Sequence, residues 1–127
     1  MSYWLKILTP YDGSDYATKA VTESIRLAER FNSKVTVLNV CWDKSDDESR
    51  ILLKGMEEPL RKSGVRYELR SARAKYPAEK ILDIIDKERF DCVVLGAKGI
   101  GVAVGLILGS VATKVASESK CTVILSR

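Results

Sequence analysis

Short hydrophobic runs alternate with amphipathic helical segments along this 127-residue chain, and this alternation limits the possible folds more than any other feature. The apolar spacing predicts helices that begin near residues 15, 46, 77 and 110. An alternation of strand and helix favours an α/β fold with a parallel sheet, and the length favours one domain over residues 1–127. The hydrophobic runs predict strands at residues 4–9, 35–40, 65–69, 91–95 and 122–125.

Local signals refine these predicted elements. Ser14 is placed to cap the first helix, and Pro77 suits the first position of the third. Pro59 lies inside the predicted second helix, so we expect a kink or break there. In the third strand, apolar residues alternate with charged ones over 65–70, which is typical of a half-exposed edge strand.

The two loops most suited to a ligand decide the strand order. Right-handed crossovers leave two common orders for five parallel strands, 3-2-1-4-5 and 2-1-3-4-5. In the first order, the loops after strands one and four, residues 9–14 and 96–109, face each other across the topological switch. We therefore predict a Rossmann-like, doubly wound sheet of order 3-2-1-4-5 with helices on both faces.

A glycine pattern follows the predicted fourth strand. Gly96, Gly99 and the pair Gly109-Ser110 form the spacing G-x2-G-x9-G-S, and Gly109-Ser110 opens the last predicted helix. Glycines after a strand let the backbone approach a ligand, and the free N–H groups of a helix start suit a phosphate. The segment lacks the lysine of a P-loop, so it belongs to neither of the standard glycine-rich motifs.

Composition excludes several function classes. The chain contains no histidine, which excludes Ser-His-Asp and Cys-His catalysis and histidine-ligated metals. Cys41, Cys92 and Cys121 lack metal-ligand spacing, and we interpret them as buried reduced thiols of a cytoplasmic protein. No signal peptide and no stretch long enough to span a bilayer is visible.

The positive charge is concentrated in residues 61–75, which carry net +5 against +4 for the whole chain. One interpretation is a charged edge strand that resists unwanted pairing. The other is a patch for nucleic acid or an acidic protein. We favour the edge strand and expect no nucleic-acid partner, because the segment has one aromatic residue and no RNA-binding motif.

The whole chain resembles the universal stress protein family. The likeness is carried by the glycine pattern and by the segments 7–40, which includes the turn Asp12-Gly13-Ser14, 76–99 and 109–127, whereas residues 43–63 are the least typical. The resemblance implies ATP, or AMP or ADP, as ligand, with or without Mg²⁺. It implies that Asp12 contacts the adenine and ribose, that the Val40 backbone binds the adenine, and that glycines carry the phosphates. The nucleotide-binding residues so predicted are Pro10, Asp12, Val40, Gly96, Lys98, Gly99, Gly109 and Ser110.

One segment departs from the family's pattern. Residues 100–108 carry no charge and no side-chain hydrogen-bond donor, whereas the family often has basic or polar residues there. A triphosphate would depend on backbone N–H groups, Ser110, Lys98 or a metal for neutralisation. The apolar segment is also a candidate surface for a partner subunit.

Three functions follow for testing. The favoured one is a regulatory protein that binds an adenine nucleotide and performs at most slow ATP hydrolysis, since no P-loop lysine or evident general base is present. The second is an interaction module of the same fold without a nucleotide. The third, a dinucleotide oxidoreductase, has only a loose glycine motif after the wrong strand. By the family resemblance, we also predict a homodimer formed through residues 122–125.

Overall fold

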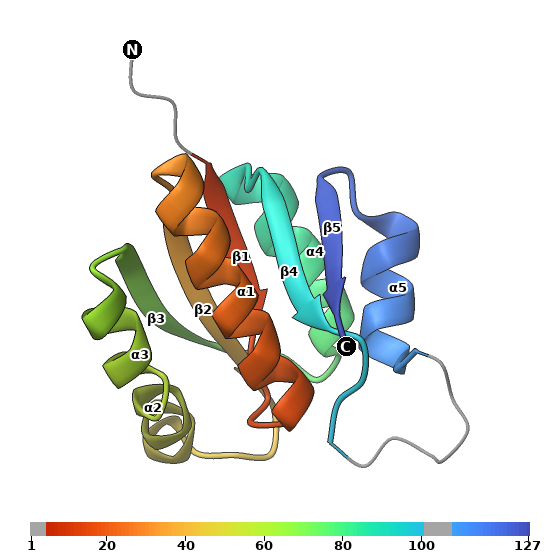
Figure 1. Ribbon diagram of the computed structural model, residues 1–127. Helices are drawn as coiled ribbons and strands as arrows, with labels where there is room; N and C mark the ends of the chain where they lie inside the picture. Colours follow the sequence, from red (N-terminus) through yellow and green to blue (C-terminus); the bar gives the residue numbers. More distant parts are fainter. Residues whose placement is uncertain (1–4, 101–107) are drawn as a thin grey trace.

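The computed structural model describes residues 5–100 and 108–127, which form a five-stranded sheet between two layers of helices (Figure 1). The strand order is β3-β2-β1-β4-β5 and every neighbouring pair is parallel, so the predicted fold and order are confirmed. The elements are β1 (Lys6–Pro10), α1 (Asp15–Phe31), β2 (Lys34–Cys41), α2 (Asp46–Lys54), α3 (Glu57–Ser63), β3 (Arg66–Arg73), α4 (Pro77–Glu88), β4 (Cys92–Gly96), α5 (Ser110–Glu118) and β5 (Thr122–Ser126).

Each face of the sheet has its own hydrophobic core, because successive side chains of a strand point to opposite faces. Ile7 of β1 packs in the core beneath α1, α2 and α3, and its neighbour Leu8 packs in the core beneath α4 and α5. Both side chains are fully buried. The central strands are therefore apolar on both faces, as parallel strands between two helical layers must be.

The predicted second helix is two helices. The chain leaves α2 at Gly55, and Met56 precedes α3, so the break lies before Pro59 rather than at it. Pro59 occupies the first turn of α3, where its missing N–H has no intrahelical acceptor in any case. A break was correctly expected, but it precedes Pro59, because a helix accepts proline in its first turn.

The basic segment 61–75 is divided among separate ion pairs. Arg70 of β3 donates two hydrogen bonds to Glu88, of 2.7 and 2.6 Å, and this contact holds the pKa of the Glu88 carboxyl below its usual value. Arg73 binds Asp46 on the opposite face, and Arg61 pairs with Glu58 within α3. β3 is an edge strand. These pairs support the interpretation of the segment as a charged edge.

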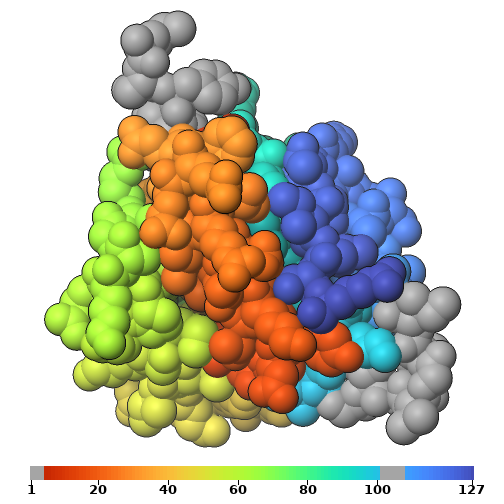
Figure 2. Space-filling view, in the orientation of Figure 1, coloured from red at the N-terminus to blue at the C-terminus, as the bar shows by residue number. Residues whose placement is uncertain are grey.

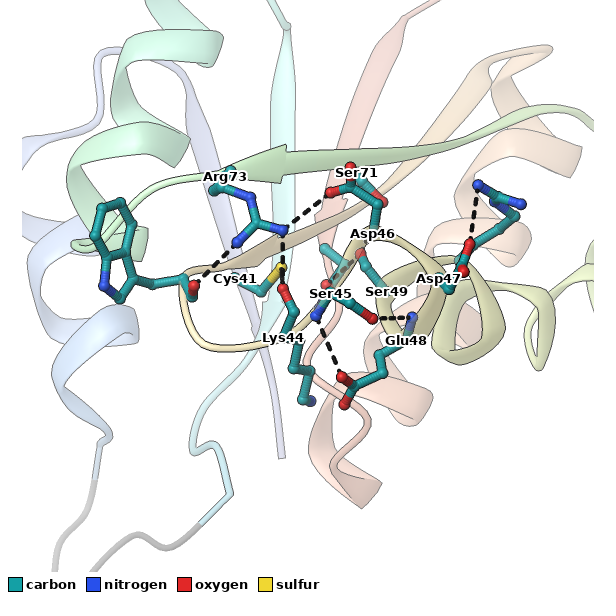
Figure 3. Close-up of polar contacts among 12 residues, drawn as sticks. Cys41, Lys44, Ser45, Asp46, Asp47, Glu48, Ser49, Ser71 and Arg73 are labelled. Carbon is teal, nitrogen blue, oxygen red and sulfur yellow. Dashed lines mark hydrogen bonds and ion pairs between the residues drawn. The ribbon is translucent and has the colours of Figure 1, made fainter.

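Arg73 also holds the loop between β2 and α2. Its guanidinium donates to the Trp42 carbonyl at 3.1 Å, to the Lys44 carbonyl at 3.0 Å and to Asp46 Oδ1 at 3.1 Å (Figure 3). One side chain from β3 therefore fixes the path of the loop that leads into α2.

The three cysteines are unpaired thiols, but their burial differs from the prediction. Cys41 and Cys92 are buried, whereas Cys121, in the turn before β5, is only half-buried. Burial, with smaller contributions from the nearby Cys121 and Asp91, raises the pKa of the Cys92 thiol to about 11. In the segments 5–100 and 108–127, no helix is both long enough and apolar enough to cross a bilayer.

Candidate functional site

A cavity of about 230 Å³ opens at the carboxyl ends of β1 and β4, where the strand order reverses. Open α/β sheets bind their ligands at such a switch point. The structure brings all eight sequence-predicted site residues together in its lining: Pro10, Asp12, Val40, Gly96, Lys98, Gly99, Gly109 and Ser110.

One part of the lining is apolar. This part is lined by Leu38 and Val40 of β2, by Pro77 and Ile81 of α4, and by Pro10 of β1. Leu38 and Ile81 are buried core residues, so this wall is fixed by packing on the sheet. A flat, apolar ring system is the kind of group that such a wall can accept.

The opposite part of the lining is polar and comes from the loop after β4 and the start of α5. Lys98, Gly99, Gly109 and Ser110 contribute to it. Lys98 and Asp12 are the charged side chains among the described lining residues. No acidic partner for Lys98 occurs within the described part of the chain, so its ammonium group is available to an anion.

Asp12 joins the two loops that meet at the cavity. Its Oδ1 accepts a hydrogen bond from the Ser14 N–H at 2.9 Å, and its Oδ2 accepts one from the Ile100 N–H at 3.3 Å. Ser14 in turn caps α1 by accepting from the Ala17 N–H at 3.1 Å. The carboxylate is therefore positioned by backbone groups of both loops, and it forms part of the polar end of the cavity.

Two of the glycines are explained by close contacts. A Cβ at position 96 would lie 2.8 Å from Tyr16 Cβ and 2.9 Å from the Tyr16 carbonyl carbon, so Gly96 lets β4 pass directly beneath α1. A Cβ at position 99 would lie 2.7 Å from Asp12 Oδ2. Gly99 thus leaves room for the carboxylate, and Gly96 is required by the fold whether or not a ligand binds.

The start of α5 is not capped by a side chain. Gly109 is the N-cap, and its own N–H donates to the Ala97 carbonyl at 2.7 Å. The first intrahelical acceptor is used by the Thr113 N–H, so the amides of Ser110, Val111 and Ala112 have no partner within the helix. All three residues line the cavity, and the exposed hydroxyl of Ser110 lies beside these amides.

Sequence reasoning missed a buried polar network that supports the site. Asn39 Nδ2 donates to the carbonyl of Tyr11 at 2.9 Å, and Tyr11 directly precedes Asp12 in the chain. The Ser49 hydroxyl of α2 donates to Asn39 Oδ1 at 2.7 Å and lies 2.7 Å from the Ser71 hydroxyl (Figure 3). The available signal was Asn39 itself, an amide side chain in a mostly apolar strand.

A metal centre made by protein side chains finds no support in residues 5–100 and 108–127, which contain no cluster of three or more potential acidic, cysteine or histidine ligands. A Mg²⁺ ion at this cavity would therefore have to take most of its ligands from water and from phosphate groups. Most of the apolar segment that we considered as an interface, residues 101–107, lies outside the described residues.

Known proteins are similar to this chain in sequence and in fold. A universal stress protein from Thermus aquaticus is 30% identical over 95% of this chain and 97% of its own length. A solved universal stress protein in complex with cAMP has a TM-score of 0.81 at 22% identity and covers 100% of this chain and 99% of its own. One from Archaeoglobus fulgidus in complex with dAMP has a TM-score of 0.78 at 23% identity and covers 100% of both chains. The model of the Universal stress protein family matches residues 4–127, and the chain therefore belongs to that family.

Proposed function

We propose that this protein binds an adenine nucleotide, ATP or its mono- or diphosphate, in the cavity between β1 and β4. The observation that carries the proposal is that one cavity combines an apolar wall with an uncapped helix start, a hydroxyl and a lysine that has no acidic partner among the described residues. An adenine ring suits the apolar wall, and a phosphate suits the helix start with its neighbouring hydroxyl and lysine. The cAMP and dAMP complexes of the two solved relatives support the same ligand class.

In this proposal each predicted residue has a specific role. Val40 offers backbone groups to the adenine, and Pro10 packs against the base or ribose. Asp12 accepts a hydrogen bond from a ribose hydroxyl or the exocyclic amine, which a carboxylate does well. The glycines keep the backbone close to the phosphate, and Ser110 and Lys98 donate to its oxygens.

Calorimetric titration with ATP and AMP tests the assignment. Asp12→Ala removes the carboxylate, and Gly109→Val places a side chain whose Cβ would lie 3.3 Å from Lys98 Cα and 3.5 Å from the Gly99 nitrogen. Both variants should bind at least about tenfold more weakly, which corresponds to the loss of one or two charge-assisted hydrogen bonds. Undiminished affinity in two folded variants would refute the site and favour the interaction-module hypothesis.

Binding, rather than fast chemistry, is the activity we propose. The charged groups of the described lining are one carboxylate and one ammonium, and Asp12 already accepts two backbone hydrogen bonds. We expect ATP turnover far below the roughly 1–10³ s⁻¹ of typical enzymes. A phosphate-release assay that gives tens of turnovers per second, abolished by Asp12→Ala, would instead identify an ATPase.

A homodimer through β5 completes the proposal. β5 is an edge strand, and its side chains reach the surface beside α1 (Figure 2). Val123, Ile124 and Leu125 are each only half-buried. Antiparallel pairing with a second β5 would satisfy the open backbone groups and cover these side chains.

Light scattering of Ile124→Asp tests the interface, because the new charge would be desolvated in an apolar seam. Val123→Pro is the second variant, since proline removes a ladder donor. Glu68→Lys, on the opposite edge strand β3, is the matched control and should keep the dimer. A wild-type monomer would exclude the interface.

The unpaired thiols support our proposal that the protein works in the reducing cytoplasm.

A further inference from the structure

The polar end of the cavity has little positive charge for an anionic ligand. Among the described lining residues, Lys98 contributes one positive charge and Asp12 one negative charge. The two residues lie on the loops that meet there, and Asp12 Oδ2 accepts from the Ile100 N–H. A phosphate bound at this end therefore meets a carboxylate as well as an ammonium group, and each further phosphate adds repulsion.

Several backbone donors near the phosphate position are already in use. The N–H groups of Ser14 and Ile100 donate to Asp12, and that of Gly109 donates to Ala97. Among the described residues, three amides at the start of α5, the Ser110 hydroxyl and the Lys98 ammonium group remain as donors. A terminal phosphate presents three acceptor oxygens, so this set is sufficient for one phosphate group.

The sequence between Lys98 and Lys114 supplies no further cation. Residues 99–113, from the loop into the second turn of α5, contain no charged side chain. Phosphates beyond the first would lose hydration without gaining a charged partner from this segment, and an uncompensated charge is costly to desolvate. A polar or basic segment at the same place would have reduced that cost.

We propose that the cavity selects a nucleoside monophosphate over the corresponding triphosphate. This inference rests on the proposed adenine-nucleotide site and specifies its ligand: one phosphate group on the uncapped start of α5, beside Lys98. Phosphate groups beyond the first are rejected because Asp12 repels them and the described lining holds no second cation to neutralise them. Magnesium weakens the discrimination, since the ion neutralises ATP before it binds.

The test is a calorimetric titration of the purified full chain with adenosine, AMP, ADP and ATP in low-salt buffer with a metal chelator. AMP should bind at least about tenfold more tightly than adenosine, because the phosphate gains charge-assisted hydrogen bonds. ATP should bind at least about tenfold more weakly than AMP, and ADP should lie between them. A repeat of the ATP titration with excess Mg²⁺ should narrow the difference.

A charge-adding variant separates electrostatics from shape. Ile100 lines the cavity and its side chain is 68% exposed, so a lysine there is tolerated and adds a cation at the rim. Ile100→Lys should raise ATP affinity relative to AMP by about fivefold or more at low salt, and added salt should remove the gain. Ile100→Gln is the neutral control of similar length and should keep the wild-type ratio.

The possible outcomes distinguish this inference from the proposed function. If ATP binds as tightly as AMP or more tightly without metal, the selectivity is refuted while the nucleotide site stands. If adenosine binds as tightly as AMP, the phosphate is not recognised and the inference fails. If none of the four ligands binds to a folded protein, the proposed function is wrong, and this inference fails with it.

Discussion

Helices α2 and α5 each follow a strand of the parallel sheet, but of these two only α2 satisfies polar groups of its own amino end. Ser45 accepts from the Glu48 N–H at 3.1 Å, and Glu48 accepts from the Ser45 N–H at 3.3 Å, which completes a capping box (Figure 3). Arg73 fixes the preceding loop. Helix α5 begins instead at Gly109, with no side-chain cap and no acidic residue in its first turn.

The difference separates a structural helix start from one that is open to a ligand. The first turn of α2 contains Asp46, Asp47 and Glu48, and these carboxylates interact favourably with the positive end of the helix and repel an anion. At the start of α5, the three amides without an intrahelical partner belong to residues that line the cavity together with Lys98. Helix α5 has no side-chain cap, and a bound anion at its amino end would supply the stabilisation that a cap normally provides.

The largest expected effect comes from Asn39, which links α2 to the loop after β1 by binding both Ser49 and the Tyr11 carbonyl. Asn39→Leu is close in size but leaves the Tyr11 carbonyl and the Ser49 hydroxyl with fewer buried partners. Each unsatisfied group costs about 1–3 kcal/mol, so urea unfolding should show a loss of at least that size. Nucleotide affinity should also fall, because Asn39 would no longer hold the Tyr11 carbonyl and so position the backbone next to Asp12.

Ser71→Ala is the matched control for Asn39→Leu. It removes the contact at the far end of the same network, where Ser71 is exposed, and should cost no more than about 0.5–1.5 kcal/mol. It should also leave nucleotide affinity unchanged. Equal losses in the two variants would show that the network does not position the loop at Asp12.

Ser110→Ala tests the open helix start and should change binding but not stability. The Ser110 hydroxyl is exposed and makes no hydrogen bond with another described residue, so the free energy of unfolding should stay within about 0.5 kcal/mol. AMP affinity should fall about tenfold with the loss of a donor to a charged oxygen. A stability loss without a change in affinity would assign Ser110 to the fold instead.

Ser45→Ala is the reciprocal change at α2. Loss of the cap should reduce the free energy of unfolding by about 0.5–2 kcal/mol, while AMP affinity should stay at the wild-type value. Ser45→Asp is the control, since aspartate also caps a helix and should recover most of the loss. If Ser45→Ala weakens AMP binding as much as Ser110→Ala does, the proposed separation between the two helix starts is wrong.

Much of the fold could be predicted because strand, helix and loop signals agreed with one another. The alternation of runs predicted the strands and the paired loops predicted their order. The site residues came from the resemblance to the family, since Val40 of β2 belongs to neither loop. The Asn39 network could not be found, because a side-chain contact between β2, α2 and the loop at Tyr11 depends on packing distances that no local pattern encodes. The break in the second helix was misplaced for a related reason: proline disfavours a helix interior but not the first turn, and only the structure shows where that turn lies.

The smallest effect concerns a charge that is already paired, in contrast to Lys98. Arg70 and Glu88 form a two-bonded ion pair at the end of α4 away from the cavity, with side chains 32% and 38% exposed. Solvent at such exposure limits the pair to about 0.2–1 kcal/mol. The hydrogen bond from Arg70 lowers the pKa of Glu88, and the positive charges of Arg70, Lys6 and Lys80 act in the same direction.

A pH series measures this pair through its sign. Because the pKa of Glu88 is lowered in the folded state, its stabilising contribution is complete above the unfolded pKa of about 4.3 and is lost as pH falls through the lower folded value. Glu88→Gln should therefore be less stable than wild type at pH 7, and the difference should vanish near the acid limit. The Arg70→Met and double variants complete a mutant cycle that isolates the pair. A loss of unfolding free energy that persists unchanged at low pH would mean that Glu88 acts through packing. AMP affinity should not change in any variant, because Arg70 and Glu88 neutralise each other far from Lys98.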